Sequence, residues 1–168
     1  ASVLAKRIDG DCRDLGGNGL ENLLLWLLQA NLGASFDGSE GPFGGFIDGI
    51  SNWLLQFFKD GNGEKNLLDL TTKLRNAVYE FGTPRQLLFG DVIAAVLRKK
   101  LENSTWKALP SYSGLPRDKW LHALQKDSFI KELWPAQHLL GQANVLKGES
   151  AIVQMPTSAG KTKATELI

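Results

Sequence analysis

The sequence predicts a mainly α-helical N-terminal domain, followed by the beginning of an α/β domain with a phosphate-binding loop. Two observations carry this prediction. Apolar residues recur at helical spacing from residue 20 to residue 101, and a short β-branched run precedes a Gly-Lys-Thr sequence near the end. We place the helical domain at residues 1–110 and the incomplete α/β domain at residues 111–168, because the segment from Pro110 to Pro116 interrupts the helical pattern.

Composition limits the class of protein. The chain has 168 residues, of which 43% are hydrophobic and 22% charged, and one cysteine. This hydrophobic share excludes a disordered chain, and the lone Cys12 excludes a disulfide scaffold. No apolar run reaches the roughly 18 residues that a membrane span needs. The N-terminus has no signal-peptide layout, so we expect a processed or trimmed N-terminus on a soluble, cytoplasmic chain without membrane contact.

Four helices are expected in the first domain. Their apolar residues run from Leu20 to Leu28, from Phe46 to Phe58, from Leu67 to Phe81 and from Phe89 to Leu101. The glycine-rich stretch 33–45 reads as a connector. Thr83 and Pro84 start the fourth helix as N-cap and first helical residue. Because amphipathic helices bury one another's apolar faces, we expect the aromatic residues of all four, Phe81 included, in the core.

Charge is distributed unevenly along the chain. Residues 1–83 carry 7 basic and 11 acidic side chains, whereas residues 84–131 carry 9 basic and 4 acidic ones. A locally basic surface attracts phosphate backbones. Arg98, Lys99 and Lys100 are therefore candidates for contact with nucleic acid, although such a run is also typical of a solvated helix face.

In the second domain the sequence predicts two helices and one strand. The helices cover residues 119–124 and 128–140, the latter with Asp127 or Ser128 as its cap and an interruption at Pro135. Residues 151–155, Ala-Ile-Val-Gln-Met, form a short apolar, β-branched run. Such a run is typical of a buried strand in a parallel sheet.

A candidate phosphate-binding loop follows that strand. It reads Pro-Thr-Ser-Ala-Gly-Lys-Thr from residue 156 to residue 162, and a helix is expected after it. In such loops consecutive backbone N–H groups surround an anion, and Thr157, Ser158, Ala159 and Gly160 would provide them. Lys161 would place its charge on the β- and γ-phosphates of ATP, and the Thr162 hydroxyl would ligate Mg²⁺. The strict pattern with a first glycine is not met, because Met155 occupies that position.

The segment from Leu133 to Thr162 resembles the start of the first motor domain of superfamily-two DExH/DEAD-box helicases, the Ski-like branch most of all. The resemblance covers about residues 116–168. In that family the first motif commonly opens with Pro-Thr, which accounts for Met155. The resemblance implies a RecA-like lobe, ATP and Mg²⁺ as cofactors, catalytic roles for Lys161 and Thr162, and an adenine-sensing role for Gln137. It also implies an aromatic residue stacked on the base, for which Trp134 and Trp120 are both candidates.

Several parts of a working motor are missing from the sequence. Phosphoryl transfer needs an acidic residue on a second strand and arginines from a second lobe. The chain contains neither an Asp-Glu-x-His nor an Asp-Glu-Ala-Asp sequence. We therefore expect the N-terminal part of a larger ATP-dependent helicase or translocase of DNA or RNA, with ATP hydrolysis belonging to the intact protein.

Two other functions stay open. The helical region 1–110 could be a protein-docking module that recruits a nuclease or effector partner, as Ski-like helicases of bacterial antiphage defence do. A phosphate-loop enzyme of another class, such as a nucleotide kinase, is less favoured because such enzymes usually keep the first glycine. His122 and His138 show no metal-ligand spacing, and we expect structural or solvent-exposed roles for both.

Overall fold

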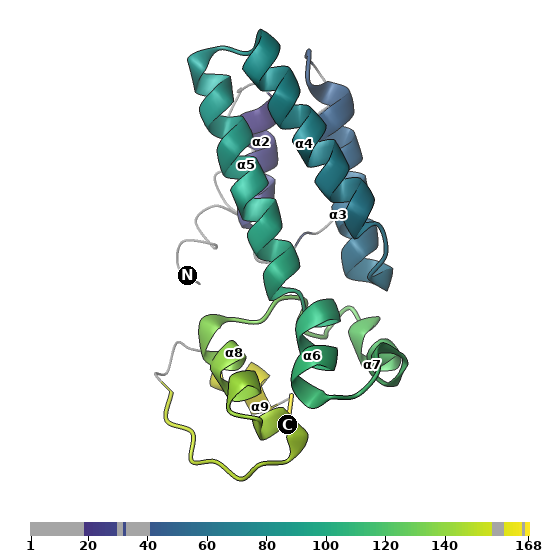
Figure 1. The fold of residues 1–168 in the computed structure, drawn as a ribbon, viewed down its shortest axis with the longest axis vertical. Coiled ribbons are helices and arrows are strands. Elements are labelled where there is room, and N and C mark those ends of the chain that lie inside the picture. The colour runs from purple at the N-terminus through teal and green to yellow at the C-terminus, as the bar shows by residue number, and fades with distance from the viewer. Residues whose placement is uncertain (1–18, 30–31, 33–40, 156–159, 166) are drawn as a thin grey trace. The chain divides into compact units, whose positions relative to one another are not determined.

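The computed structural model describes residues 19–29, 32, 41–155, 160–165 and 167–168. Within them the chain is mainly α-helical, with eight α-helices and one 3-10 helix (Figure 1). The described residues separate into two compact units. Unit 1 holds the described residues up to Phe57 together with 61–99, and unit 2 holds 58–60 and the described residues from Lys100 onward.

Unit 1 is built from the four expected helices. They are α2 (Gly19–Leu28), α3 (Gly44–Asp60), α4 (Glu64–Phe81) and α5 (Pro84–Asn103), the last turns of α3 and α5 belonging to unit 2. Each presents an apolar face to the core. The fully buried side chains of unit 1 include Leu20, Leu23, Leu27, Ile47, Ile50, Leu54, Phe57, Leu67, Leu74, Ile93 and Leu97.

The ends of these helices follow from local sequence. The α3 helix ends at Gly61, which adopts the left-handed conformation with φ 73° that favours glycine. At the start of α5, the Thr83 hydroxyl accepts from the backbone N–H of Gln86 at 3.4 Å. The Gln86 side chain in turn accepts from the backbone N–H of Thr83 at 2.8 Å. This reciprocal capping box confirms the predicted helix start.

Two aromatic residues of unit 1 are exposed although they were expected in the core, Tyr79 at 59% and Phe81. Phe81 is the last residue of α4, and 76% of its surface is exposed. Its position follows from the helix end, because Gly82 leaves the helix with an extended backbone. The apolar stripe of α4 therefore ends at Val78, which is fully buried.

Unit 2 contains shorter helices joined by irregular segments. These are α6 (Thr105–Ser113), α7 (Arg117–Leu124), α8 (Pro135–Gln142), the 3-10 helix η1 (Val145–Lys147) and α9 (Lys161–Thr165). The α6 helix was not predicted. Ser104 caps it, accepting from the backbone N–H of Trp106 at 3.2 Å, and Pro110 lies inside it.

The helix predicted over residues 128–140 is wrong in its first half. Helix α8 begins only at Pro135, because proline is well suited to the first helical position and forces the preceding residue out of the helical conformation. Trp134 is accordingly extended, with φ −84° and ψ 161°. The residues before it pair with the α5–α6 junction instead, through an isolated antiparallel bridge between Ser104 and Glu132.

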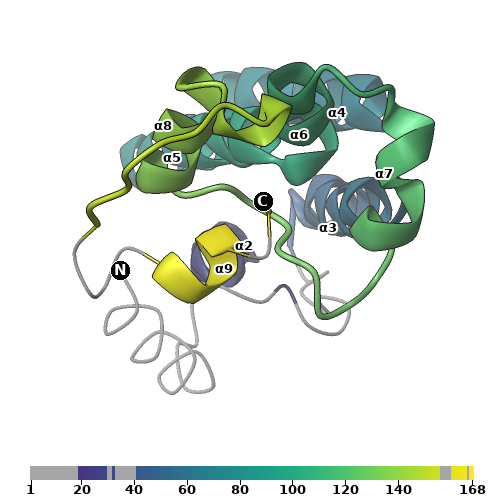
Figure 2. The same ribbon diagram turned by 90° about the horizontal axis from the view of Figure 1, so that it is seen from below.

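The predicted buried strand over 151–155 is also wrong. These residues have no regular secondary structure, and Ile152 is fully exposed while Val153 is 45% exposed. Neither Figure 1 nor Figure 2 draws a strand there. A strand is stabilised by neighbouring strands, and the described residues form no sheet in which this run could pair. For the same reason no RecA-like α/β domain is seen in the described part of the chain.

Candidate nucleotide site

The described part of the candidate phosphate loop is the turn from Gly160 into α9. Gly160 has φ 76°, a left-handed conformation that is strained for residues with a Cβ. Its carbonyl accepts from the backbone N–H of Ala164 at 2.9 Å, which forms the first turn of α9. Lys161 and Thr162 lie exposed on that turn. Thr157, Ser158 and Ala159 lie outside the described residues.

Gln137 lies beside this turn. The Gln137 side chain is buried, and a Cβ placed on Gly160 would be 3.3 Å from its Nε2 atom. Its Oε1 atom accepts from the backbone N–H of Trp134 at 2.8 Å, so the side chain also caps the N-terminus of α8. The structure thus brings the predicted adenine-sensing residue next to the predicted phosphate loop, although they are distant in sequence.

Of the two candidate tryptophans, only Trp134 lies at this turn. The same Cβ on Gly160 would be 3.7 Å from Cε3 of Trp134, whose side chain is 38% exposed. Trp120 instead donates from its ring nitrogen to the Ser113 hydroxyl at 2.9 Å, and this bond joins α7 to the end of α6. An aromatic surface beside Gly160 is therefore offered by Trp134.

A small apolar cluster joins α9 to α8 and η1. Leu140 of α8, Val145 of η1 and Ala164 of α9 are buried together, and Met155 packs against them. Met155 therefore anchors the irregular segment 149–155, even though the residues before it are exposed. This packing fixes the start of α9 against α8, the helix whose N-terminus carries Trp134 and Gln137.

Lys161 and Thr162, the residues predicted to contact the phosphates and Mg²⁺, are both accessible at the start of α9. Lys161 and Thr162 present a cation and a hydroxyl on the exposed first turn of α9, which are the groups that a phosphate tail with Mg²⁺ requires. Within the described ranges no three His, Cys, Asp or Glu side chains come together in a way that could hold a metal. The sequence names Thr162 alone as a protein ligand for Mg²⁺, and this stays a prediction.

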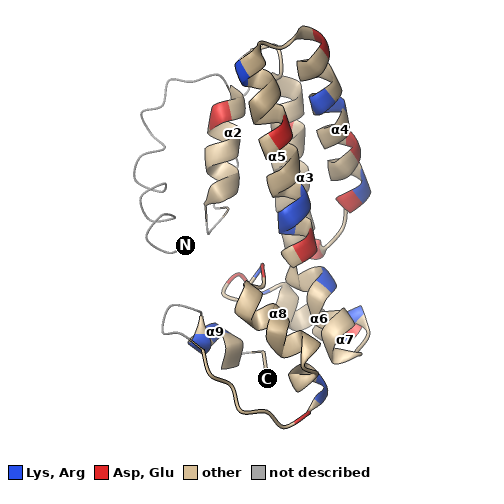
Figure 3. Cartoon of the chain, turned by 60° about the vertical axis from the view of Figure 1, so that its left-hand side comes forward, with Lys and Arg blue, Asp and Glu red and all other residues tan. Residues whose placement is uncertain are grey.

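The basic run of α5 is split by the structure. Arg98 and Lys99 are exposed, and Figure 3 shows basic residues toward the C-terminal end of this helix. Lys100 is buried, and its Nζ atom forms an ion pair with Oε2 of Glu132 at 2.6 Å. Lys100 thus belongs to the interior of unit 2, and the contact predicted for it with nucleic acid would require this pair to break.

A polar network near the site was missed by sequence reasoning. His138 accepts or donates at both ring nitrogens, with Tyr112 Oη 2.9 Å from Nδ1 and Asn103 Oδ1 3.2 Å from Nε2. This is the structural role expected for His138, whereas His122 is exposed on α7. No spacing in the sequence connects residues 103, 112 and 138, because their proximity depends on the packing of three separate helices.

Lys131 also has a structural role that the sequence did not reveal. Its Nζ atom donates to the backbone oxygens of Leu124 and Lys126, each at 2.9 Å, and so satisfies carbonyls at the end of α7. Burial lowers the pKa of Lys131, and the nearby charge of Asp127 partly offsets that effect. The lysine thus secures the turn after α7, from which the chain leads to the candidate site.

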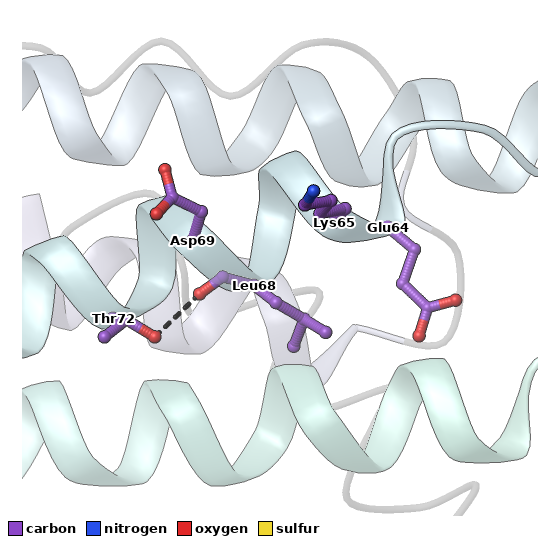
Figure 4. Close-up of a pocket in the computed structure, with 5 residues that line it drawn as sticks. All are labelled: Glu64, Lys65, Leu68, Asp69 and Thr72. Atoms are coloured by element: carbon purple, nitrogen blue, oxygen red, sulfur yellow. Dashed lines mark hydrogen bonds between the residues drawn. The ribbon is translucent and has the colours of Figure 1, made fainter.

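The surface hollow shown in Figure 4 lies on α4 of unit 1. Its lining residues, Glu64, Lys65, Leu68, Asp69 and Thr72, all come from one helix face. The Thr72 hydroxyl donates to the Leu68 carbonyl of the same helix at 2.9 Å. Charges of both signs alternate over this face, so it offers no convergent set of groups for one ligand.

None of the helices in the described part is long and apolar enough to span a membrane. Comparisons of the chain with models of protein families, with curated proteins and with solved structures found no match.

Proposed function

We propose that this chain is the N-terminal part of an ATP-dependent nucleic-acid helicase or translocase, and that residues 134–165 bind its ATP. The observation that supports this most strongly is the position of Gln137 and Trp134 beside Gly160. Separate parts of the sequence predict that Gln137 and the candidate Trp134 contact the adenine and that Gly160 contacts the phosphates. A chance Gly-Lys-Thr sequence would have no reason to lie next to the candidate adenine-binding residues.

Each residue has a distinct part in this proposal. The face of Trp134 stacks on the adenine, and the amide of Gln137 recognises the donor and acceptor on the adenine edge. Backbone N–H groups of Thr157, Ser158, Ala159 and Gly160 surround the phosphates, and Lys161 neutralises their charge. Bound through Thr162, Mg²⁺ supplies charge neutralisation at the β- and γ-phosphates.

In the same proposal, residues 111–168 belong to a RecA-like lobe in the intact protein. The β-branched run 151–155 then becomes a strand only in a sheet that other strands complete. Binding of ATP depends on the local turn and on its two neighbours, whereas hydrolysis also needs an acidic residue and arginines outside the motifs found here. We therefore expect this chain to bind MgATP without hydrolysing it.

Calorimetric titration of the chain with MgATP tests the proposal. We expect Lys161→Ala to weaken binding at least about tenfold, because it removes the charge that contacts the phosphates. Lys147→Ala is the matched control, since it removes an exposed lysine of the same unit outside the loop. Equal affinities of the two variants, or no binding by the unaltered chain, would contradict the proposal.

A second candidate function is that residues 1–110 dock a protein partner, such as the nuclease or effector of an antiphage defence system. It is favoured by the burial of Lys100, which reduces the exposed basic run to Arg98 and Lys99. Unit 1 also exposes large apolar side chains, with Leu88 63% and Phe81 76% exposed.

Fluorescence anisotropy with a labelled single-stranded oligonucleotide separates the two roles of this region. If α5 contacts nucleic acid directly, the double substitution Arg98→Ala and Lys99→Ala weakens binding and flattens its dependence on salt. Unchanged oligonucleotide binding in the double variant, combined with loss of partner capture in Leu88→Asp, favours docking.

A further inference from the structure

Three side chains of unit 2, each from a different helix, form a continuous hydrogen-bonded network next to the candidate site. The Tyr112 hydroxyl of α6 lies 2.9 Å from Nδ1 of His138, and Nε2 of His138 lies 3.2 Å from Oδ1 of Asn103 at the end of α5. His138 directly follows Gln137 in α8. Tyr112 and Asn103 therefore hold His138 at both of its ring nitrogens, and His138 is the neighbour of the predicted adenine-sensing residue Gln137.

The hydrogen-bonding groups define the state of the imidazole ring. The side-chain oxygen of Asn103 can only accept, so Nε2 of His138 carries a proton. In the neutral ring Nδ1 then accepts from the Tyr112 hydroxyl. Both bonds are satisfied by one tautomer, and together they hold the ring in one orientation.

The ring of Tyr112 also contacts the backbone of α8 directly. A Cβ placed on Gly141 would lie 2.2 Å from Cδ2 of Tyr112, so only glycine permits this close approach. The rings of Tyr112 and His138 meet edge to face, with centroids 5.8 Å apart and an interplanar angle of 76°. Because His138 and Gly141 lie three residues apart, Tyr112 spans one face of α8.

Asn103 also binds Leu133, the residue that precedes Trp134. Its backbone oxygen accepts from the N–H of Leu133 at 2.7 Å, while its side chain contacts His138. The neighbouring Thr105 N–H donates to the Lys131 carbonyl at 3.0 Å, and the ion pair of buried Lys100 with half-buried Glu132 reinforces the same junction. In the sequence, Trp134 and Gln137 thus lie between Leu133 and His138, which both hydrogen-bond to Asn103.

We propose that His138, held between Tyr112 and Asn103, is a positioning residue of the nucleotide site. It sets the orientation in which Trp134 and Gln137 meet the adenine. The identity of the ligand as ATP rests on the proposed function, whereas the positioning of Trp134 by the network does not. Loss of the Tyr112 hydroxyl leaves the packing of its ring on Gly141 in place but frees the His138 ring to rotate.

The experiment uses the whole chain labelled with 5-fluorotryptophan, observed by ¹⁹F NMR. The chain contains five tryptophans, and Trp134→Phe assigns the resonance of Trp134. Tyr112→Phe is compared with Tyr79→Phe, because the chain has two tyrosines and each donates from its hydroxyl to a side chain. Tyr79 belongs to unit 1, so its substitution controls for the loss of a tyrosine hydrogen bond as such.

We expect Tyr112→Phe to shift or broaden the Trp134 resonance without nucleotide, and to raise the Kd for MgATP about fivefold. Tyr79→Phe should change neither quantity. His138→Ala should have a larger effect than His138→Gln, because glutamine retains an N–H donor for Asn103.

An unmoved Trp134 resonance in both Tyr112→Phe and His138→Ala would overturn the inference. So would a moved resonance with unchanged MgATP affinity in a chain that binds MgATP. If the unaltered chain does not bind MgATP, the proposed function fails, and the resonance of Trp134 alone then decides whether the network positions this residue.

Discussion

Buried polar side chains bond within their own helices in unit 1, whereas two of the four described in unit 2 bond to distant parts of the chain and the other two, Ser104 and Gln137, cap helices. In unit 1 the hydroxyls of Ser51 and Thr71 donate to carbonyls of their own helices, three and four residues back. In unit 2 the side chains of Lys100 and Thr105 reach partners 32 and 26 residues away. The first kind of bond follows from helix geometry alone, whereas the second defines an irregular chain path.

This difference explains where sequence reasoning succeeded. The apolar stripes and capping residues of α2, α3, α4 and α5 are local signals, and all four helices were predicted. The extended segment before α8 is held by bonds to the α5–α6 junction, for which no local signal exists. Substitutions of Leu97 and Glu132 test whether unit 1 depends on apolar burial and unit 2 on long-range polar pairs, and substitutions of Asp91 and Ile152 test surface positions of the two units.

The largest effect is expected from a core substitution in unit 1. Leu97 of α5 is fully buried, so Leu97→Ala should lower the free energy of unfolding by about 3 kcal/mol, through lost burial and a cavity. Leu88→Ala on the same helix is the matched control, because Leu88 is 63% exposed. Urea unfolding followed by circular dichroism measures both, and similar losses would show that the core of unit 1 is wrongly placed.

A smaller but clear loss is expected when a polar pair of unit 2 is broken. Glu132→Ala leaves the buried Lys100 without its ion-pair partner and should lower the free energy of unfolding by about 2 kcal/mol. In the exposed pair of Lys73 and Asp69, Asp69→Ala should cost less than about 0.5 kcal/mol. Equal costs, measured by the same urea titration, would argue against a buried role for Lys100.

A pH-dependent contribution is expected at the surface of unit 1. A hydrogen bond from Tyr79, together with the bond and charge of Arg75, lowers the pKa of Asp91. A carboxylate with a lowered pKa stabilises the folded state above its unfolded pKa, and this contribution disappears as the pH falls through the folded value. The difference in Tm between the unaltered chain and Asp91→Asn should therefore be largest near pH 7.

The same thermal scans at decreasing pH provide the check. The Tm difference should begin to shrink at about pH 4, where Asp91 of the unfolded chain is protonated, and should disappear as the pH falls through the lowered pKa of the folded carboxylate. A difference that stays constant down to pH 2 would mean that the carboxylate charge is not responsible.

The smallest effect is expected in segment 151–155. Ile152 is fully exposed, so Ile152→Asp should change the free energy of unfolding by less than about 0.5 kcal/mol. A buried strand residue would give a loss of several kcal/mol on the same substitution. A large loss in urea unfolding would therefore restore the strand that the sequence predicts.

For the candidate site, sequence and structure contributed different parts. The Gly-Lys-Thr motif and the helix after it were readable from the sequence, and α9 begins at Lys161. The choice of Trp134 over Trp120 depended on which tryptophan lies near Gly160. The roles of Asn103 and Tyr112 depended on the meeting of three helices, which no spacing in the sequence encodes.

By itself the sequence determined the helices of unit 1, their ends and the residues of the phosphate-loop motif, because helical periodicity and capping act over a few neighbouring residues. Only the tertiary structure decided that Lys100 is buried, that Trp134 and Gln137 lie beside Gly160, and that residues 151–155 form no strand. Those outcomes depend on partners distant in the chain. Burial, ion pairing and sheet formation require such partners to be present, whatever the local preference of the residues concerned.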